Sequence, residues 1–459
     1  MSARTRTIVA VVGVLAVLGP VPVGAAGRPD TVPEATGGAT IEVPADHATI
    51  QEAVDAAAEG DLILVAPGVY NEAVNVTRPD LTIRGLDRNE VILDGEFELD
   101  NGIRVLGAGG VAVENMTARN YTFNGFFWTG VDGYRGSYLT AYRNGDYGLY
   151  AFDSVNGLFE HSYAAGSPDA GLYIGQCYPC DAVIDDVHAE HNGLGYSGTN
   201  SGGNLLIVNS RFNNNRAGIV PNSGSYELCY PQRETTIAGN LIYSNNQGDT
   251  PAIDDAIVAM GNGVLISGGV RNTISRNRVW DHDVAGIALA PFPEEQALDD
   301  QPGPEEWDTP CADTKDDPVS TAPPESLLWD AYQNVVTDNV VEDSRIADIA
   351  VGSIVDPATL GNCFAGNTFA TSAPIDVEAL APCEGEGAGD WTAGALDLGA
   401  RIAAAESAPP SVDYAEAELP ELEPLENLPD AATAPAAPAT DMPPTVDVDA
   451  IVVPEAPTE

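Results

Sequence analysis

The sequence predicts an all-β fold, a right-handed parallel β-helix, from three observations. First, glycines recur at intervals of 23 or 24 residues, with one interval of 45. They are Gly102, Gly125, Gly148, Gly171, Gly195, Gly218, Gly263 and Gly286. Second, the first and third residues after each glycine are mostly apolar while the residue between them varies, as in a strand whose side chains alternate between two faces. Third, the repeats lack a helical apolar period and the consensus of leucine-rich repeats, which leaves a β-solenoid.

Asparagines recur at a second position of the repeat. Asn240, Asn277 and Asn339 stand in the similar settings GNLIY, RNRVW and DNVVE. Stacked coils would place these side chains above one another at a turn, where they satisfy backbone groups. We therefore predict an inward asparagine ladder with a structural role.

The N-terminus predicts export. Arg4 and Arg6 precede an apolar run that begins at Ile8, and small residues follow it. This pattern is typical of a secretory signal peptide, here residues 1–25, followed by a flexible lead at 26–40. No second long apolar stretch follows, so we expect a freely secreted monomer without a transmembrane anchor.

The main body and the tail differ in composition. Residues 41–387 should form the β-helix, closed at its first coil by a short helix that begins with the capping box Thr49–Glu52. Residues 388–459 are dominated by Ala, Pro, Glu and Asp. Such a segment buries too little apolar surface to fold alone, so we expect a disordered acidic tail.

Six cysteines in an exported chain favour disulfides, although six allow 15 pairings. Our preferred pairing joins Cys177 with Cys180, Cys229 with Cys311, and Cys363 with Cys383. The first pair forms a CxxC motif, for which a redox or metal role is the minor alternative.

The charge restricts the partners. The formal net charge is −50, from 69 acidic and 19 basic residues. Nucleic acid binding requires a basic surface and is excluded. Acidic polysaccharides would be repelled unless Ca²⁺ bridged them, so Ca²⁺ is the one cofactor that we consider. A saline or alkaline habitat is the simpler explanation of the acidity.

Three segments are longer than the repeat allows and predict loops on one face of the solenoid. The loops span residues 221–234, 247–262 and 291–332, near the first strand of their coils. Insertions in solenoids often line the binding face. We therefore expect these loops to wall a groove beside the first strand column.

An aromatic stripe lies in the outward column of that groove. Phe127, Tyr150 and Tyr173 occupy equivalent positions in successive coils and form either a sugar-stacking platform or a purely structural ladder. Polar residues nearby that could bind substrate are Gln176, Asn200 and Arg104. Asp132 and Asp153 are the candidate catalytic carboxylates, because glycoside hydrolysis uses two carboxyl groups about 5 to 10 Å apart.

The N-terminal part also resembles a known family. The segment TIQEAVDAAAEGDLILVAPGVYNEAV (49–74), followed by LTIRG (81–85), looks like the opening of pectin-lyase-like right-handed β-helix proteins. DAGLYIGQ (169–176) is similar to exported β-helix repeat proteins of uncharacterised function, including relatives of the NosD-like group. Residues 67–72 resemble the GxYxE motif of pectinesterases, but later motifs of pectinesterases, polygalacturonases, pectate lyases and mannuronan epimerases are missing. The resemblance therefore implies the fold and leaves the activity open.

Two functions remain open at this point. The first is a secreted protein that binds or processes an extracellular polysaccharide, as a lyase or hydrolase, along the Phe127, Tyr150 and Tyr173 groove. The second is a non-catalytic surface or adhesion module in which the solenoid is a rigid spacer.

Overall fold

The computed structural model describes residues 38–295, 311, 319–321, 326–405 and 407–457. The predicted signal peptide, most of the flexible lead and much of the 291–332 loop lie outside the described residues. The statements below concern the unit from residue 37 onward.

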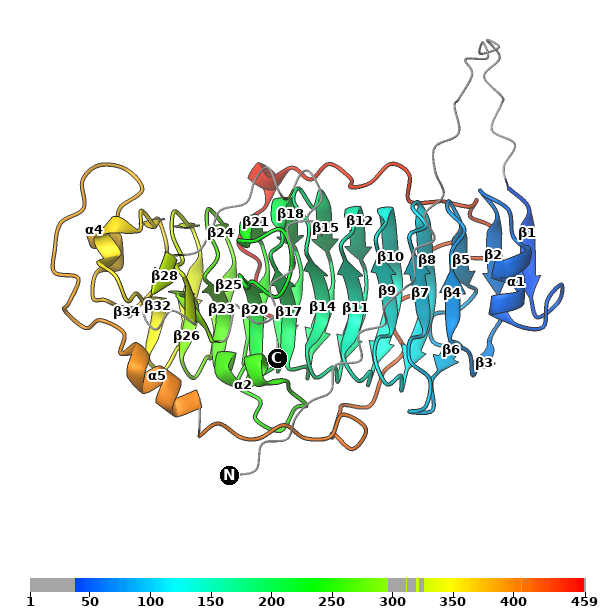
Figure 1. Cartoon of the computed structure of the whole chain (residues 1–459), viewed down its shortest axis with the longest axis horizontal. Helices are drawn as coiled ribbons and strands as arrows, with labels where there is room; N and C mark the ends of the chain where they lie inside the picture. The colour runs from blue at the N-terminus through cyan, green and yellow to red at the C-terminus, as the bar shows by residue number, and fades with distance from the viewer. Residues whose placement is uncertain (1–37, 296–310, 312–318, 322–325, 406, 458–459) are drawn as a thin grey trace, which may run out of the picture. The chain divides into compact units, whose positions relative to one another are not determined.

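An 11-stranded parallel sheet forms one face of the β-helix (Figure 1). Each coil contributes one strand, and neighbouring coils pair in register. The strands are β4 (Val74–Val76), β7 (Ile103–Leu106), β9 (Phe126–Thr129), β11 (Tyr147–Phe152), β14 (Ala170–Gly175), β17 (Leu194–Thr199), β20 (Ala217–Asn222), β23 (Asn262–Ser267), β26 (Ala285–Ala290), β32 (Ala347–Val351) and β34 (Ser372–Ala373).

The rest of each coil belongs to a 20-stranded parallel sheet. Its strands are β1 (Thr40–Val43), β2 (Leu62–Val65), β3 (Gly68–Tyr70), β5 (Thr82–Gly85), β6 (Val91–Asp94), β8 (Val111–Arg119), β10 (Asp132–Tyr142), β12 (Val155–Glu160), β13 (Tyr163–Ala165), β15 (Ala182–Asp185), β16 (His188–Glu190), β18 (Gly202–Val208), β19 (Arg211–Asn213), β21 (Arg233–Ala238), β22 (Leu241–Tyr243), β24 (Thr273–Ser275), β25 (Arg278–Trp280), β30 (Val335–Thr337), β31 (Val340–Glu342) and β33 (Cys363–Ala365). Together the two sheets confirm the predicted all-β parallel β-helix.

Smaller elements lie outside the coils. The 291–332 excursion contains a three-stranded antiparallel sheet of β27 (Phe292–Glu295), β28 (Val319–Thr321) and β29 (Ser326–Trp329). The helices are α1 (Ile50–Ala56), α2 (Asp254–Ala259), α4 (Val377–Leu380) and α5 (Leu398–Ala405), with short 3₁₀ turns η2 (Pro357–Thr359) and η3 (Val448–Ala450).

The repeating glycine allows the coils to stack closely. A Cβ atom at Gly148 would lie 2.5 Å from the carbonyl oxygen of Gly171, and one at Gly195 would lie 2.7 Å from that of Gly218. No side chain fits at these distances, so the repeat position requires glycine. The residues one and three positions later, such as Phe126 and Trp128, are fully buried in the core.

The asparagine ladder forms as predicted. The amide oxygen of Asn277 accepts from the backbone N–H of Asn240 at 3.0 Å, and that of Asn339 accepts from the N–H of Asn277 at 2.9 Å. All three side chains are fully buried. Each one satisfies turn backbone that no water reaches, which gives the ladder a structural role.

A second ladder runs through Asn192, Asn215 and Asn245 and ends at His282, which should make folding pH-dependent. Its Nε2 lies 3.3 Å from Asn245 Nδ2, and burial lowers the pKa of His282 to about 3. Because the unfolded pKa is about 6.5, the unfolded state binds the proton more tightly, and stability present above pH 6.5 is lost as pH falls toward 3. We expect His282 by itself to lower the free energy of unfolding by about 1.4 kcal/mol per pH unit in that window.

His282→Asn tests this expectation, because asparagine continues the ladder without titrating. Denaturant unfolding between pH 7 and pH 4 should show that the wild type loses stability relative to His282→Asn as pH falls. His47→Asn, at a histidine outside the ladders, should keep the wild-type dependence. Equal slopes in all three proteins would refute the assignment.

Helix α1 covers the first coil. The Thr49 hydroxyl accepts from the N–H of Glu52 at 3.1 Å, and α1 contacts β1, β2 and β4. The Glu72 carboxylate accepts from the N–H groups of Ile50 and Gln51, both at 3.0 Å. Glu72 is the glutamate of the GxYxE segment, so in this chain that residue caps a helix.

The C-terminal segment differs from the disorder that its composition predicts. It runs along the β-helix, orange to red in Figure 1, and its backbone carbonyls accept hydrogen bonds from arginines of the coils. Buried Arg216 donates to Pro409 and Pro410, and buried Arg84 donates to Ala434 and Pro435. Further donors with carbonyl acceptors in the segment are Arg88, Arg143 and Arg278.

The arginines on the surface of the coils explain why the C-terminal segment is ordered. A chain too poor in apolar residues to fold alone can still be held where guanidinium groups need acceptors. We call residues 407–457 the strap.

Candidate functional site

The outward column of the 11-stranded sheet follows the predicted register. Arg104 pairs with Phe127, Phe127 with Tyr150, and Tyr150 with Tyr173. The rings of Phe127 and Tyr150 stack with centroids 4.6 Å apart, and Tyr147 stacks on Tyr150 at 4.3 Å. Phe127 and Tyr150 are half-buried, so part of each ring faces solvent.

Tyr173 does not belong to an open platform. Its side chain is 1% exposed, because the loop after β20 covers it. The hydroxyl lies 2.7 Å and 2.8 Å from the two carboxylate oxygens of Glu227 in that loop. The predicted three-ring platform is therefore reduced to Phe127 and Tyr150.

Gln176 and Asn200 hold the same loop in place. The Gln176 side-chain oxygen accepts from the N–H of Leu228 at 2.9 Å. The Asn200 amide donates to the carbonyls of Gly224 and Glu227 at 2.6 Å and 2.8 Å. Both residues position Glu227 and have their polar groups engaged within the protein.

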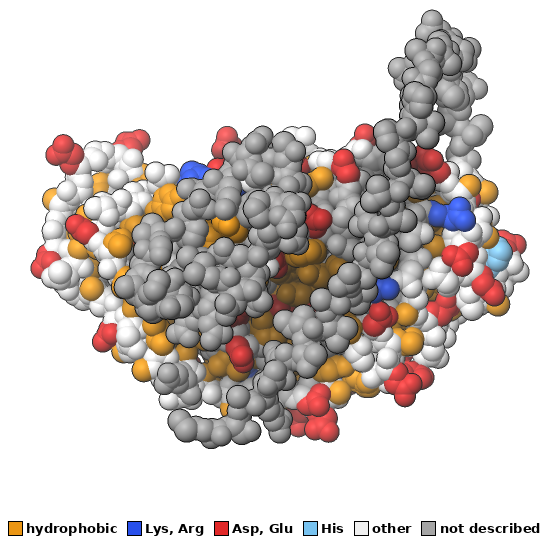
Figure 2. All heavy atoms as spheres, in the orientation of Figure 1, with side chains coloured by type: hydrophobic (Ala, Val, Ile, Leu, Met, Phe, Trp, Pro, Cys, Tyr) orange, Lys and Arg blue, Asp and Glu red, His pale blue; other side chains and the backbone are white. Residues whose placement is uncertain are grey.

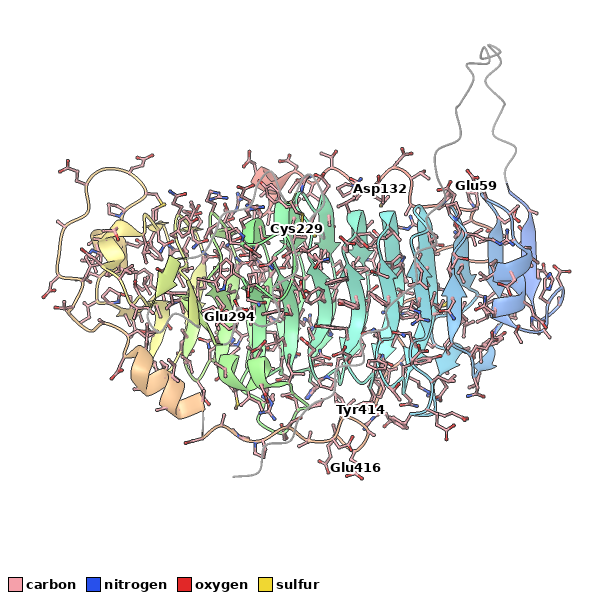
Figure 3. The ribbon with its side chains drawn as sticks, in the orientation of Figure 1. Glu59, Asp132, Cys229, Glu294, Tyr414 and Glu416 are labelled. Atoms are coloured by element: carbon pink, nitrogen blue, oxygen red, sulfur yellow. A yellow bond between two sulfur atoms is a disulfide. The ribbon has the colours of Figure 1, made fainter. Side chains whose placement is uncertain are left out.

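The predicted carboxylate pair lies elsewhere. Asp132 begins β10 in the 20-stranded sheet, and its Oδ1 accepts from Asn156 Nδ2 at 2.6 Å; it lies at the upper edge in Figure 3. Asp153 adopts a left-handed backbone conformation, with φ of 51°, directly after β11. Arg104 pairs with Asp100 at 3.3 Å. None of these residues lines the pocket described next.

A small pocket opens between β17, β20, β23 and α2, and it is lined by Glu227, the partner of Tyr173. Its volume is about 120 Å³. We call it the carboxyl pocket, and its polar lining residues are Tyr147, Asp169, Ser197, Thr199, Asn222, Tyr226, Glu227, Asp255 and Ser267. None of the described residues that line it is basic.

The carboxyl groups here have raised pKa values. Burial raises the pKa of Glu227 to about 8, although the hydrogen bonds from Tyr173 oppose the shift. Burial and the charge of Asp146 raise the pKa of Asp169 well above its usual range, and the Tyr147 hydroxyl, 2.7 Å from Asp169 Oδ2, favours the carboxylate. Burial also raises the pKa of Asp146 to about 6. Neighbouring carboxyl groups whose pKa values are all raised by burial are typical of functional sites.

The sequence contained a signal for part of this site. Asp146 and Asp169 stand two residues before Gly148 and Gly171, so stacking places them in adjacent coils. Glu227 gave no such signal, because it lies in an insertion outside the repeat.

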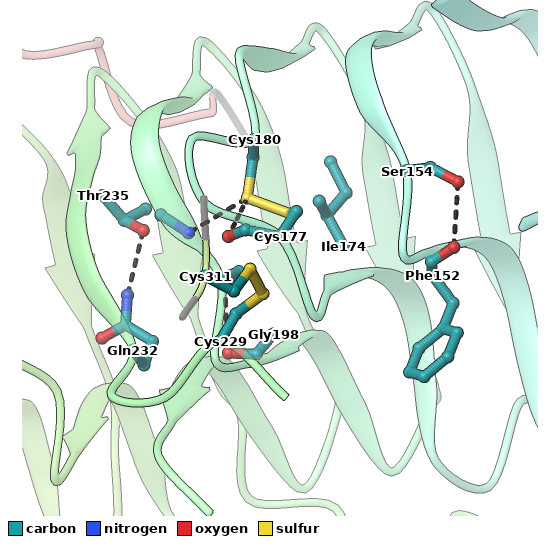
Figure 4. The surroundings of a disulfide bond; sticks show 12 residues. Phe152, Ser154, Ile174, Cys177, Cys180, Gly198, Cys229, Gln232, Thr235 and Cys311 are labelled. Atoms are coloured by element: carbon teal, nitrogen blue, oxygen red, sulfur yellow. Dashed lines mark hydrogen bonds between the residues drawn. A yellow bond between two sulfur atoms is a disulfide. The ribbon is translucent and has the colours of Figure 1, made fainter. Parts of the chain in front are cut away.

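Disulfides fix the surrounding loops (Figure 4). Cys229 bonds to Cys311 and ties the loop of Glu227 to the 291–332 excursion. The other bonds join Cys177 to Cys180 and Cys363 to Cys383, so all three preferred pairs form. Cys177 and Cys180 are buried, which argues for a structural bond and against the redox alternative.

Two further features bear on the predicted cofactor and anchor. No group of three His, Cys, Asp or Glu side chains in the described part of the chain is arranged to hold a metal ion. Among the same residues, no helix has the length and apolarity needed to cross a membrane.

Comparison with known proteins agrees with this architecture. Residues 101–291 match the family model described as right handed beta helix region. No curated protein sequence matches the chain.

Several solved structures resemble the chain at low sequence identity. The A-module of mannuronan C-5 epimerase from Azotobacter vinelandii is 14% identical, with 76% of this chain and 96% of that one covered and a TM-score of 0.42. An alginate lyase from a Paenibacillus species is 15% identical, with 73% and 96% covered and a TM-score of 0.41. The catalytic domain of an alpha-1,3-glucanase is 13% identical, with 80% and 70% covered and a TM-score of 0.44.

These likenesses carry no argument about activity. The in-register parallel sheets and the family match over residues 101–291 together establish the architecture. The described residues of the protein form a right-handed parallel β-helix.

Proposed function

We propose that the protein is an exported enzyme that hydrolyses glycosidic bonds of an uncharged polysaccharide in the carboxyl pocket. One observation carries the proposal: Glu227, with a pKa of about 8, shares this pocket with Asp169. Glycoside hydrolysis needs one carboxyl group that is protonated at working pH and a second that acts as a base. The environment of Glu227 suits the first role. Asp169 would take the second role in its ionised form, which the hydrogen bond from the Tyr147 hydroxyl favours against the effect of burial.

The reaction assigns each group one task. Glu227 donates its proton to the glycosidic oxygen, and the bond from the sugar carbon to that oxygen breaks with its electron pair leaving on the oxygen. Water adds to the sugar carbon while Asp169 accepts the released proton. The hydrogen bond from Tyr147 holds Asp169 in position. Solvent then reprotonates Glu227 and removes the proton from Asp169.

The pocket favours an uncharged substrate. A uronate would bring a carboxylate next to Asp169, Glu227 and Asp255, and none of the described lining residues offers a positive charge. Elimination from a uronate also needs a cation to neutralise that carboxylate. Hydrolysis of an uncharged glycan is therefore favoured over the lyase reaction.

Export is part of the proposal. The predicted signal peptide at residues 1–25 and three disulfides suit a protein that works in an oxidising, extracellular environment. A polysaccharide partner on the outside of a cell agrees with that location.

A panel of glycans tests the proposal. The mature protein is incubated with neutral and uronate polysaccharides, with and without Ca²⁺, and the products are weighed by mass spectrometry. We expect fragments that carry one added water, from a neutral glycan, without a need for Ca²⁺. Unsaturated fragments from uronates, or binding without any product, would contradict the hydrolase assignment.

The aromatic pair should contribute to glycan binding. We expect Phe127→Leu to weaken oligosaccharide binding about tenfold, equivalent to about 1.4 kcal/mol, because a ring face available for stacking is lost while apolar volume is kept. Titration calorimetry measures the change.

A second stacked pair provides the control for this prediction. Tyr243 and Trp280 stack at 4.3 Å on the 20-stranded sheet. Trp280→Leu should therefore leave oligosaccharide binding unchanged. Equal losses in the two variants would show that stacking serves the fold alone.

A further inference from the structure

The carboxyl pocket continues into a much larger groove. The two share Tyr226, Asp255, Val258, Leu265, Ser267 and Phe292 among their lining residues. The groove has a volume of about 1110 Å³ and extends over β23 and β26 toward α5. This volume lies just above the usual range for small-ligand sites, about 300 to 1,000 Å³.

The walls of the groove are mainly apolar. Met260, Leu265 and Ala288 line its floor side, and Leu398 and Ile402 line it from α5. Figure 2 shows apolar side chains gathered on this face. In water the hydroxyl groups of a sugar chain are hydrogen-bonded. A sugar chain bound here would leave most of them without partners, which disfavours its binding.

Several polar groups at the groove are already engaged. Glu294 accepts from the N–H and hydroxyl of Ser225 and from the indole N–H of Trp329. Arg345 pairs with Asp283 at 3.2 Å. Asp255 and Arg401 also line the groove, but most of its lining residues are apolar, so most of the surface left for a ligand is apolar.

Two large apolar side chains on the rim are exposed to solvent. Ile354 is 62% exposed and Ile402 is 55% exposed. Exposed apolar residues that gather around a concavity mark a site for an apolar ligand.

We propose that the groove binds an acyl or alkyl chain attached to the sugar that enters the carboxyl pocket. The substrate would then be an amphiphilic glycoside, with its sugar against Glu227 and its chain along α5. This inference rests on the proposed function, because the pocket supplies the sugar end. It goes beyond that function by identifying an acyl or alkyl chain as the group attached to the sugar that is cleaved.

A homologous series of alkyl glucosides tests the inference below their micelle concentrations. The wild type and Glu227→Gln are titrated with butyl, hexyl and octyl glucoside by calorimetry. Each added methylene should raise affinity about threefold to fourfold, as expected for burial of one CH₂ group. Because Glu227→Gln keeps the groove, it should show the same increment.

A matched pair of substitutions locates the binding. Ile402→Asp, in the groove, should lower octyl glucoside affinity about tenfold and reduce the increment per methylene. Val69→Asp, at a residue that is 58% exposed on β3 and outside the groove, should change neither.

The outcomes separate this inference from the proposed function. Affinity that does not rise with chain length, or that falls equally in Ile402→Asp and Val69→Asp, would overturn the apolar subsite. Hydrolysis of unsubstituted glycans in that case would leave the proposed function standing. Chain-length-dependent binding with no hydrolysis of any glycoside would overturn the enzyme assignment and keep the apolar chemistry of the groove.

Discussion

Glu227→Gln should lower the rate of glycan hydrolysis by about 10²-fold to 10⁴-fold while leaving substrate affinity nearly unchanged. Glutamine keeps the shape of the side chain and still hydrogen-bonds to the Tyr173 hydroxyl. It has no proton to give to the glycosidic oxygen. The loss should therefore fall on kcat and leave KM nearly unchanged, as initial rates on an active glycan would show.

The pH profile supplies an independent check on Glu227. A general acid works only while protonated, so wild-type activity should fall as pH rises through the Glu227 pKa of about 8. Glu227→Gln should lack this alkaline decrease. Asp132→Asn is the matched control, because Asp132 lies outside the carboxyl pocket, and it should keep the wild-type rate and profile. An equal loss in Asp132→Asn would return the catalytic role to the carboxylate predicted from sequence.

Removal of the strap should destabilise the β-helix strongly. In a chain that ends at residue 405, Arg84 and Arg216 lose backbone acceptors that they now reach at 2.7 Å and 2.8 Å. Each hydrogen bond from a charged group that is exchanged for one to water costs about 1.5–3 kcal/mol. Across the arginines that bind the strap, we expect a loss on the order of 5 kcal/mol in the free energy of unfolding, read as an earlier transition in guanidinium chloride.

A shorter truncation controls for chain length and charge. Deleting residues 455–459 removes two glutamates but leaves the arginine contacts in place. That variant should unfold at the wild-type denaturant concentration. If the chain ending at residue 405 also matched the wild type, the segment would be disordered in solution, as its composition predicts.

The fold could be predicted because its causes are local in sequence. A glycine such as Gly148 is required wherever one coil touches the next, and Asn277 is required wherever a turn needs an inward amide. Both requirements return with every coil, so the period of the sequence reports them directly. The outward register of Phe127, Tyr150 and Tyr173 follows from the same period.

The site could not be predicted because its decisive contacts are not periodic. Glu227 lies in an insertion whose path depends on Asn200, Gln176 and a disulfide, so nothing in the repeat places it over Tyr173. The strap is held by backbone carbonyls, which every residue possesses, so composition gives no sign of the arginines that bind them. The sequence predicts Asp132 as catalytic from its position in the repeat. The pocket instead contains the carboxyl group of Glu227, and the fold of its loop places it there.

The most direct test of the account is the protonation state of Glu227 in the folded protein at neutral pH, measured by infrared difference spectroscopy between the wild type and Glu227→Gln. The account predicts a protonated carboxyl signal at pH 7 that disappears as pH rises through about 8. A carboxylate signal at pH 7, with titration near the ordinary glutamate pKa, would contradict it, because Glu227 would then have no proton to donate.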